Sequence, residues 1–150
     1  SDANAEGITV DQLAVAIRDG VGLTGRQADA VAAFRDRLIE EGLSEARIAI
    51  RISRYAEAQL RARAINIART EMQAALNGGQ QALWDIARQR GILPDTMKRR
   101  WMAAQDDRLC IRCEALDETE VGLTEEFAPG LMMPPEHPSC RCSVGIVNGR

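Results

Sequence analysis

The chain has 150 residues, of which 45% are hydrophobic, 27% are charged and only 3% are aromatic. That length is enough to bury a core, and the composition excludes collagen-like, low-complexity and highly charged disordered proteins. No window holds the roughly 18 uninterrupted apolar residues of a membrane span, so we expect no membrane partner. With so few aromatic residues the core must be aliphatic, which favours helices.

The net charge of −3 conceals an uneven distribution, because both ends are acidic while residues 47–69 carry six arginines against Glu57. Four arginines fall within one helical arc and form a candidate surface for a polyanion: Arg47, Arg51, Arg54 and Arg61. The alternative is a solvated face whose arginine stems cover apolar neighbours. We prefer this alternative, since no aromatic side chain accompanies the arginines for base stacking, and we expect little or no DNA binding at physiological salt.

The first 90 residues have the spacing of apolar residues that is typical of helices. The pattern and its capping residues predict four of them: residues 10–19, a helix capped by Thr24 that ends at Gly42, a helix from Ser44 that stops at Asn77-Gly78-Gly79, and residues 80–90 before Gly91. The apolar face of the third helix drifts along its length. This helix therefore either packs against different neighbours or breaks between residues 56 and 64.

The character of the sequence changes after Pro94. Residues 97–103 are ambiguous between a helical turn and a strand, whereas residues 118–123 and 141–147 alternate like strands. A proline-rich irregular loop lies between those two segments. We therefore predict an α+β fold, with a mainly helical region over residues 1–95 and a small α+β lobe over residues 96–150, packed together as one domain.

All four cysteines and the only histidine lie in this lobe, as Cys110-x-x-Cys113 and, after 23 intervening residues, His137-Pro-Ser-Cys140-Arg-Cys142. Two cysteines separated by two residues can bind one metal ion from a tight turn, and a distant second pair closes a tetrahedral zinc site. We predict Cys110, Cys113, His137 and Cys140 as ligands, because the turn at Pro138 brings His137 and Cys140 together. Cys142 is the alternative fourth ligand.

Two disulfides or four buried thiols are the alternatives to zinc. The N-terminal residues lack a secretory signal, so we expect a reducing cytosol, where clustered cysteines more often bind metal. The lobe has few large apolar residues, and a zinc ion can supply on the order of 10 kcal/mol of folding free energy. Four protein ligands leave no open position, so we expect a structural ion, no small-molecule substrate and no enzymatic activity.

Two further groups of charged and polar residues have structural interpretations as well as catalytic or pairing ones. Arg69-Thr70-Glu71 lies inside the third predicted helix, and we interpret it as surface. The pair Asp106-Asp107 looks like the two carboxylates of an acid–base site, but turn chemistry explains it equally well. We predict that large apolar side chains pack between the helical region and the lobe. They are Trp84 and Trp101, together with the apolar set Ile65, Met72 and Leu76.

The chain resembles the phage Mu F-like (MuF) head morphogenesis family of minor head proteins over residues 61–147. The resemblance depends on an ordered set of motifs: an Arg-Thr-Glu helix, then Asp107-Arg-Leu-Cys-x-x-Cys113, then Pro134-Pro-Glu-His-Pro-Ser-Cys-Arg-Cys142. The family usually has Gly where this chain has Glu118, so we expect that turn to differ in shape. Residues 1–60 carry no motif that matches.

The resemblance implies a structural protein, present in few copies in the virion of a tailed phage or prophage. Its implied partners are the portal protein, other head proteins and the packaged DNA. Its implied location is the bacterial cytoplasm during assembly and the virion head afterwards. Two alternatives stay open: a zinc-containing nucleic-acid-binding module, or the MuF domain of a prophage toxin fusion.

Overall fold

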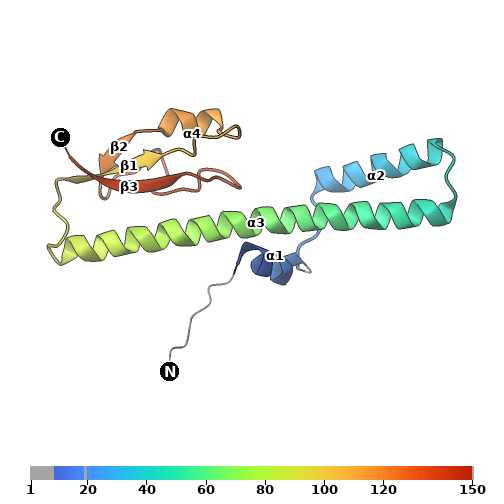
Figure 1. Ribbon diagram of the computed structural model, residues 1–150, viewed down its shortest axis with the longest axis horizontal. Helices are drawn as coiled ribbons and strands as arrows, with labels where there is room; N and C mark the ends of the chain where they lie inside the picture. Colours follow the sequence, from blue (N-terminus) through green and yellow to red (C-terminus); the bar gives the residue numbers. More distant parts are fainter. Residues whose placement is uncertain (1–8, 19, 150) are drawn as a thin grey trace, which may run out of the picture. The chain divides into compact units, whose positions relative to one another are not determined.

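The computed structural model of the protein describes residues 9–18 and 20–149 (Figure 1). Helices α1 to α3 come first, and a small antiparallel three-stranded sheet with the Cys/His cluster follows, which confirms the predicted fold class. The elements within the described residues are α1 (Val10–Arg18), α2 (Gly25–Glu40), α3 (Glu45–Gln89), β1 (Met97–Met102), α4 (Ile111–Leu116), β2 (Glu120–Gly122) and β3 (Ser143–Asn148).

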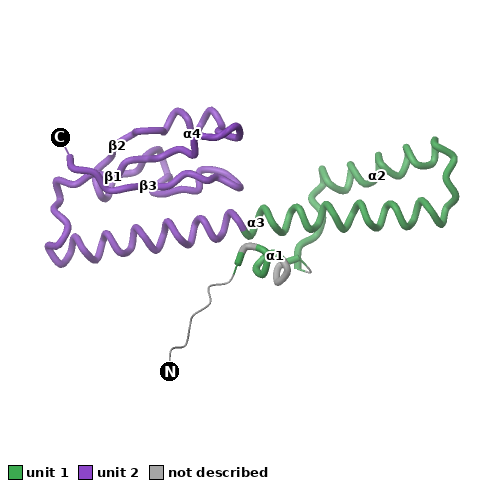
Figure 2. The backbone as a smooth tube through the Cα atoms, in the orientation of Figure 1, with its two compact units in different colours: residues 1–68 green, residues 69–150 purple. Residues whose placement is uncertain are grey.

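The chain divides into two compact units, residues 1–68 (unit 1) and residues 69–150 (unit 2), as Figure 2 shows. Helix α3 contributes to both units. The predicted division at residue 95 marks the change from helix to sheet and stays a prediction as a domain boundary. No helix in the described part of the chain combines the length and apolar character that crossing a membrane requires.

Unit 1 consists of α1, α2 and the first half of α3. Thr24 caps α2 through a capping box in which its hydroxyl accepts from the Gln27 amide at 3.3 Å, while the Gln27 side chain accepts from the Thr24 amide at 3.0 Å. After α2 the chain turns at Gly42, whose φ of 73° suits a residue without a side chain. These predicted helix limits are confirmed, except that Asp19 lies outside the described residues.

Small side chains bring the helices of unit 1 together. Ala14 of α1 is buried against Ala64 and Ala68 of α3, and Ile65 packs against the same cluster. The rings of Phe34 and Tyr55 lie 4.7 Å apart and join α2 to α3. The structure therefore places Ile65 in the core of unit 1, and our assignment of this residue to the interface with the lobe is wrong.

Helix α3 is continuous over 45 residues, so the predicted stop at Asn77-Gly78-Gly79 is wrong. Of the two alternatives for its drifting apolar face, the break between residues 56 and 64 does not occur, and the helix packs against different neighbours in unit 1 and in unit 2. The expected fourth helix is the end of α3. Each glycine costs a helix about 1 kcal/mol, but Asn77 is buried and its amide donates to the Gln73 carbonyl at 3.0 Å. The side chains of Gln73 and Gln81, on either side of the two glycines, also donate to carbonyls of the lobe, and these contacts outweigh the weak helix propensity. The helix ends before Gly91, which has a φ of 69°.

The sheet of unit 2 has the order β2-β1-β3, with both pairs antiparallel and β1 in the centre. The ambiguous segment 97–103 is thus a strand, and the two segments predicted as strands form its neighbours. Helix α4 was not predicted. Trp101 of β1 is fully buried, lies edge-on to Phe127 at 5.2 Å between centroids, and belongs to the cluster against which Trp84 packs. Leu76, expected in this core, is 67% exposed.

Arg99 on the same face of β1 is fully buried, which the sequence analysis did not anticipate. Its guanidinium donates to the Gln81 side chain at 2.7 Å, to the Met132 carbonyl at 2.8 Å and to the Glu125 carbonyl. It also lies 5.3 Å from the centroid of the Phe127 ring. Burial lowers the pKa of Arg99, although the nearby Asp85 and Glu125 oppose that change. Arg99 therefore links α3, the sheet and the proline-rich loop of unit 2.

Candidate metal centre

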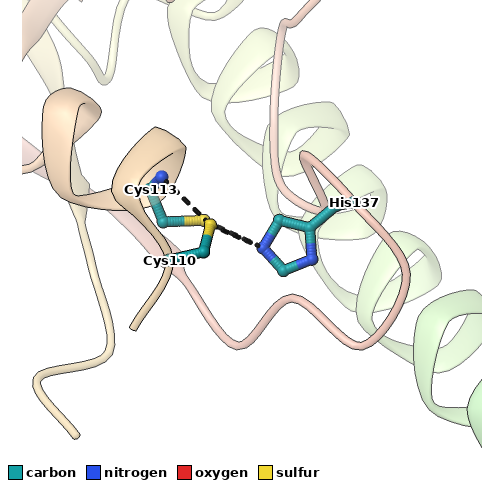
Figure 3. A group of neighbouring side chains, drawn as sticks. All are labelled: Cys110, Cys113 and His137. Carbon is teal, nitrogen blue, oxygen red and sulfur yellow. Dashed lines mark hydrogen bonds between the residues drawn. The ribbon is translucent and has the colours of Figure 1, made fainter. Parts of the chain in front are cut away.

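The first half of the candidate site is the start of α4. Cys110 is the N-cap residue of this helix, and its sulfur accepts from the Cys113 backbone amide at 3.4 Å. The hydrogen bond curls the chain so that both sulfur atoms point to the same side, toward the loop that carries His137 (Figure 3). This is the geometry in which a Cys-x-x-Cys turn can bind one ion with two thiolates.

His137 completes a first group of three possible ligands. Its Nε2 atom lies 3.2 Å from the sulfur of Cys110 and 3.2 Å from the sulfur of Cys113. Its other ring nitrogen, Nδ1, lies 2.9 Å from the Pro138 carbonyl oxygen. A carbonyl can only accept, so Nδ1 carries the proton, and in the neutral ring Nε2 offers its lone pair to the two cysteines. Metal-binding histidines are commonly oriented in this way.

A second group shares Cys113 with the first and adds Cys140 and Cys142. The sulfur atoms of Cys113 and Cys140 lie 3.8 Å apart, and all four cysteines are free thiols. Ideal zinc bond lengths give tetrahedral edges of about 3.8 Å between sulfurs and about 3.5 Å between sulfur and nitrogen. The Cys113–Cys140 separation of 3.8 Å matches such an edge, whereas the separations of 3.2 Å between His137 Nε2 and the two sulfurs are about 0.3 Å shorter than it. The four predicted ligands are divided between the two groups, because Cys140 belongs only to the second. Both groups could hold a metal ion, and Cys113 is common to them.

The loop after His137 is a tight turn, as the sequence predicted. The Cys140 amide donates to the His137 carbonyl at 3.0 Å, and Ser139 in the third position has a φ of 58°. Pro138 in the second position and a positive φ in the third are the signature of a type II turn, where the third residue is usually glycine. The turn thus directs the His137 ring and the Cys140 thiol, from neighbouring positions, toward α4.

Helix α3 supports this turn from within unit 2. The hydroxyl of Thr70 accepts from the Ser139 amide at 2.9 Å, and the Gln73 side chain donates to the Cys142 carbonyl at 2.9 Å. The interpretation of Thr70 as surface is therefore wrong, whereas Arg69 and Glu71 beside it are exposed. The one signal in the sequence was the spacing of three between Thr70 and Gln73, which places both on one face of a helix.

The thiols of the cluster differ in pKa because their hydrogen bonds and their burial differ. The Cys113 amide, together with the Cys113 thiol, lowers the pKa of Cys110 to about 7. Burial raises the pKa of Cys113 and that of Cys142. Cys110 thus ionises before Cys113 and Cys142, and an adjacent cation would favour the ionised form of those two thiols.

The space beside these ligands is small. A cavity of about 20 Å³ is lined by both cysteines of α4, by His137 and Cys142, and by Arg108 and Arg141. This cavity is far smaller than the roughly 300–1,000 Å³ of usual small-molecule sites. Of the terminal cysteine pair, Cys142 lines it and Cys140 does not. Asp106 accepts from the Arg108 amide at 2.9 Å and from the Arg141 side chain, which agrees with its interpretation as a turn residue.

The four arginines of the candidate polyanion surface are all exposed on α3 in unit 1: Arg47, Arg51, Arg54 and Arg61. Arg54 and Arg61 border a cavity of about 560 Å³ that Asp11 and Glu57 also line. The two acidic side chains reduce the positive potential at that end of the surface.

A family model described as "Phage Mu protein F like protein" matches residues 35–145. The chain belongs to this family. The match includes every candidate metal ligand. It begins at residue 35, upstream of the motifs in residues 61–147 on which the resemblance depends, and so it also covers the end of α2. Membership links the chain to phage head morphogenesis, and the family consists generally of structural head proteins. Searches of curated proteins and of solved structures gave no match.

Proposed function

We propose that this Mu F-like chain is a structural minor head protein of a tailed phage or prophage, present in few copies per virion. It assembles in the bacterial cytoplasm with the portal protein and other head proteins, and it then stays in the head near the packaged DNA. The family match over residues 35–145 carries this proposal. The small cavity of about 20 Å³ at the Cys/His cluster agrees with a structural role for that cluster.

The experiment is a quantitative analysis of purified particles. A phage or induced prophage that encodes the chain is purified, and mass spectrometry compares the chain with the portal and major capsid proteins. We expect a copy number far below that of the major capsid protein, and DNA-filled heads that are lost when the gene is deleted. Absence from both proheads and virions, with an unchanged titre after deletion, would refute the proposal.

We further propose that Cys110, Cys113, His137 and Cys140 hold one structural zinc ion that fixes the C-terminal lobe. The support is the His137 ring, whose Nδ1 is occupied by the Pro138 carbonyl while Nε2 faces two sulfurs. The ion would supply cross-linking of α4 to the loop after residue 136. The α4 N-cap, the turn at Pro138 and the hydrogen bond of Thr70 with the Ser139 amide support this proposal.

Elemental analysis tests the ion and the ligand choice together. The purified chain should contain one equivalent of zinc, and Cys110→Ser, Cys113→Ser and Cys140→Ser should each lose it. Cys142→Ser is the matched control and should keep the metal. Less than half an equivalent of zinc in the unmodified chain would remove the site. If Cys142→Ser loses zinc and Cys140→Ser keeps it, the site stands with Cys142 as the fourth ligand.

The exposed arginines favour no second function. The net charge of the chain is −3, and acidic side chains share the surface around Arg54 and Arg61. We expect a fluorescence anisotropy titration at physiological salt to detect little DNA binding. Sub-micromolar affinity with a steep salt dependence would instead favour a nucleic-acid-binding module.

A further inference from the structure

The Cys/His cluster contains one donor more than the proposed zinc ion uses. Four of its five side chains are ligands in that proposal, and Cys142 is the fifth. Cys142 is only 2% exposed and lines the cavity of about 20 Å³ beside the ligands. Its position is fixed on both sides, because its carbonyl accepts from the Gln73 side chain at 2.9 Å and β3 begins at the next residue. This thiol is therefore also placed to bind a metal ion.

The second group, which consists of Cys113, Cys140 and Cys142, contains only sulfur donors. Its three sulfur atoms all lie within 4.8 Å of one another, and those of Cys113 and Cys140 are 3.8 Å apart. All three residues are buried, with exposed fractions of 2%, 4% and 2%. Solvent therefore has little access to a fourth coordination position in this group.

The first group differs from the second in its donors and in its burial. It includes a nitrogen of His137, and both Cys110 and His137 are only half-buried. Within the part of the chain that the structure describes, no carboxylate joins either group. The first group is thus a mixed and partly accessible set of donors, whereas the second is a buried set of sulfurs.

These differences favour different metals. Zinc is almost always four-coordinate in structural sites and accepts nitrogen and sulfur together, which suits the first group when Cys140 completes it. Three thiolates without nitrogen, oxygen or water suit a softer ion. The cuprous ion (Cu⁺) is such an ion, and it needs no fourth ligand. Arg108 and Arg141 line the same cavity, and their positive charge favours the ionised form of the thiols.

We propose that Cys113, Cys140 and Cys142 form an all-sulfur site for one cuprous ion. The inference rests on the cluster of the proposed zinc site and adds a second metal to it. Zinc uses Cys113 and Cys140 together with Cys110 and His137, whereas copper uses them together with Cys142. Because the two sites share two ligands, copper and zinc compete, and each metal has at least one ligand that the other does not use.

A copper titration tests the competition. The full reduced chain is titrated without oxygen, first free of zinc and then with one equivalent of zinc, and Cu⁺ is added as its acetonitrile complex against the coloured chelator bicinchoninic acid. We expect one equivalent of copper to bind in both cases, with release of the zinc in the second. No copper binding, or copper binding with the zinc retained, overturns the proposal. A chain that binds copper but no zinc refutes the zinc proposal alone.

Two serine variants separate the sites. Cys142→Ser should keep zinc and should bind copper at least about tenfold more weakly, because one of three thiolate ligands is lost. Cys110→Ser is the matched control, since serine is a preferred N-cap residue and preserves the start of α4. This control should lose zinc and should change copper affinity less than about threefold. Equal weakening of copper binding in the two variants, or loss of zinc from Cys142→Ser, overturns the division of ligands.

X-ray absorption at the copper edge identifies the ligands in the unmodified chain, so it does not depend on the folding of any variant. We expect three sulfur neighbours around copper and no scattering from an imidazole ring. An imidazole signal would place the copper at His137 in the first group and would overturn the proposal.

Discussion

The two units of this protein are stabilised in different ways. Unit 1 brings helices together through alanines and one aromatic pair, and it leaves Ile39 and Ile50 half exposed. Unit 2 buries an aromatic core, a fully enclosed arginine and the Cys/His cluster. Small interfaces between helices contribute little apolar area, whereas a buried polar network requires every partner to be present. The stability of unit 2 should therefore depend on a few irreplaceable groups.

Removal of the proposed zinc ion should have the largest effect on the difference in stability between the two units. Both tryptophans, Trp84 and Trp101, lie in unit 2, so tryptophan fluorescence reports on this unit alone. A strong chelator should shift the emission of unit 2 to longer wavelength and lower its unfolding midpoint, because ligand binding energy is folding energy. The helical signal of unit 1 should persist. Unchanged emission after complete removal of metal would mean that unit 2 folds without it.

Trp101→Ala should cost about 3 kcal/mol of folding free energy, since it empties the centre of the core of unit 2. Trp84 remains in this variant as the fluorescent reporter. Urea unfolding followed by fluorescence measures the loss. A midpoint equal to that of the unmodified chain would show that Trp101 is not central to the core.

Arg99→Met should cost about 2 kcal/mol, because it leaves the Gln81 side chain and the carbonyls of Met132 and Glu125 without their donor. Arg100→Met is the matched control on the other face of β1. Arg100 pairs with Glu120 at 2.6 Å near the surface, where such pairs contribute at most about 1 kcal/mol. Equal losses in the two variants would contradict the structural role of Arg99.

Thr70→Val should cost about 1 kcal/mol, since it removes the acceptor of the Ser139 amide and keeps the shape of the side chain. Thr70→Ser keeps the hydroxyl and should be closer to the unmodified chain. Thermal unfolding of both variants, with zinc content measured in parallel, gives the comparison. A larger loss in the serine variant than in the valine variant would argue that Thr70 acts through packing.

Glu118→Gly should stabilise unit 2 by about 0.5 kcal/mol. Glu118 has a φ of 61°, a left-handed conformation that costs a residue with a side chain about 1 kcal/mol. The variant also loses a contact with Arg100 at 3.3 Å, which is exposed and worth little. Glu118→Ala loses the same contact but keeps the backbone cost, so it should be less stable than Glu118→Gly. The reverse order would show that the ion pair outweighs the backbone.

Local chemistry made much of this structure predictable. Thr24 and Gly42 define the limits of α2 because capping depends on neighbours in sequence, and the His137–Cys140 turn followed from Pro138 in the same way. The expected change of shape at Glu118 stays a prediction, and Glu118 itself has a φ of 61°, a backbone conformation that glycine favours.

The remaining features depend on groups far apart in the chain. Helix α3 passes through Gly78-Gly79 because Gln73 and Gln81 on either side are bonded to the lobe, which local propensity cannot reveal. The burial of Arg99 depends on carbonyls that lie more than 20 residues away in the sequence. Thr70 supports the turn because its hydroxyl accepts from the Ser139 amide, 69 residues later in the sequence. Such contacts become visible only when the elements are assembled.

The hydrogen bond from the His137 ring to the Pro138 carbonyl has a consequence for the order of folding. It joins neighbouring residues, and the Cys110–Cys113 bond spans only three, so each half of the metal site can form before the lobe does. Joining the halves then closes a single loop of some two dozen residues, whose entropic cost grows only slowly with length. We expect the ion to be captured early, so that it acts as a nucleus for the sheet, and refolding of unit 2 should accelerate with zinc concentration.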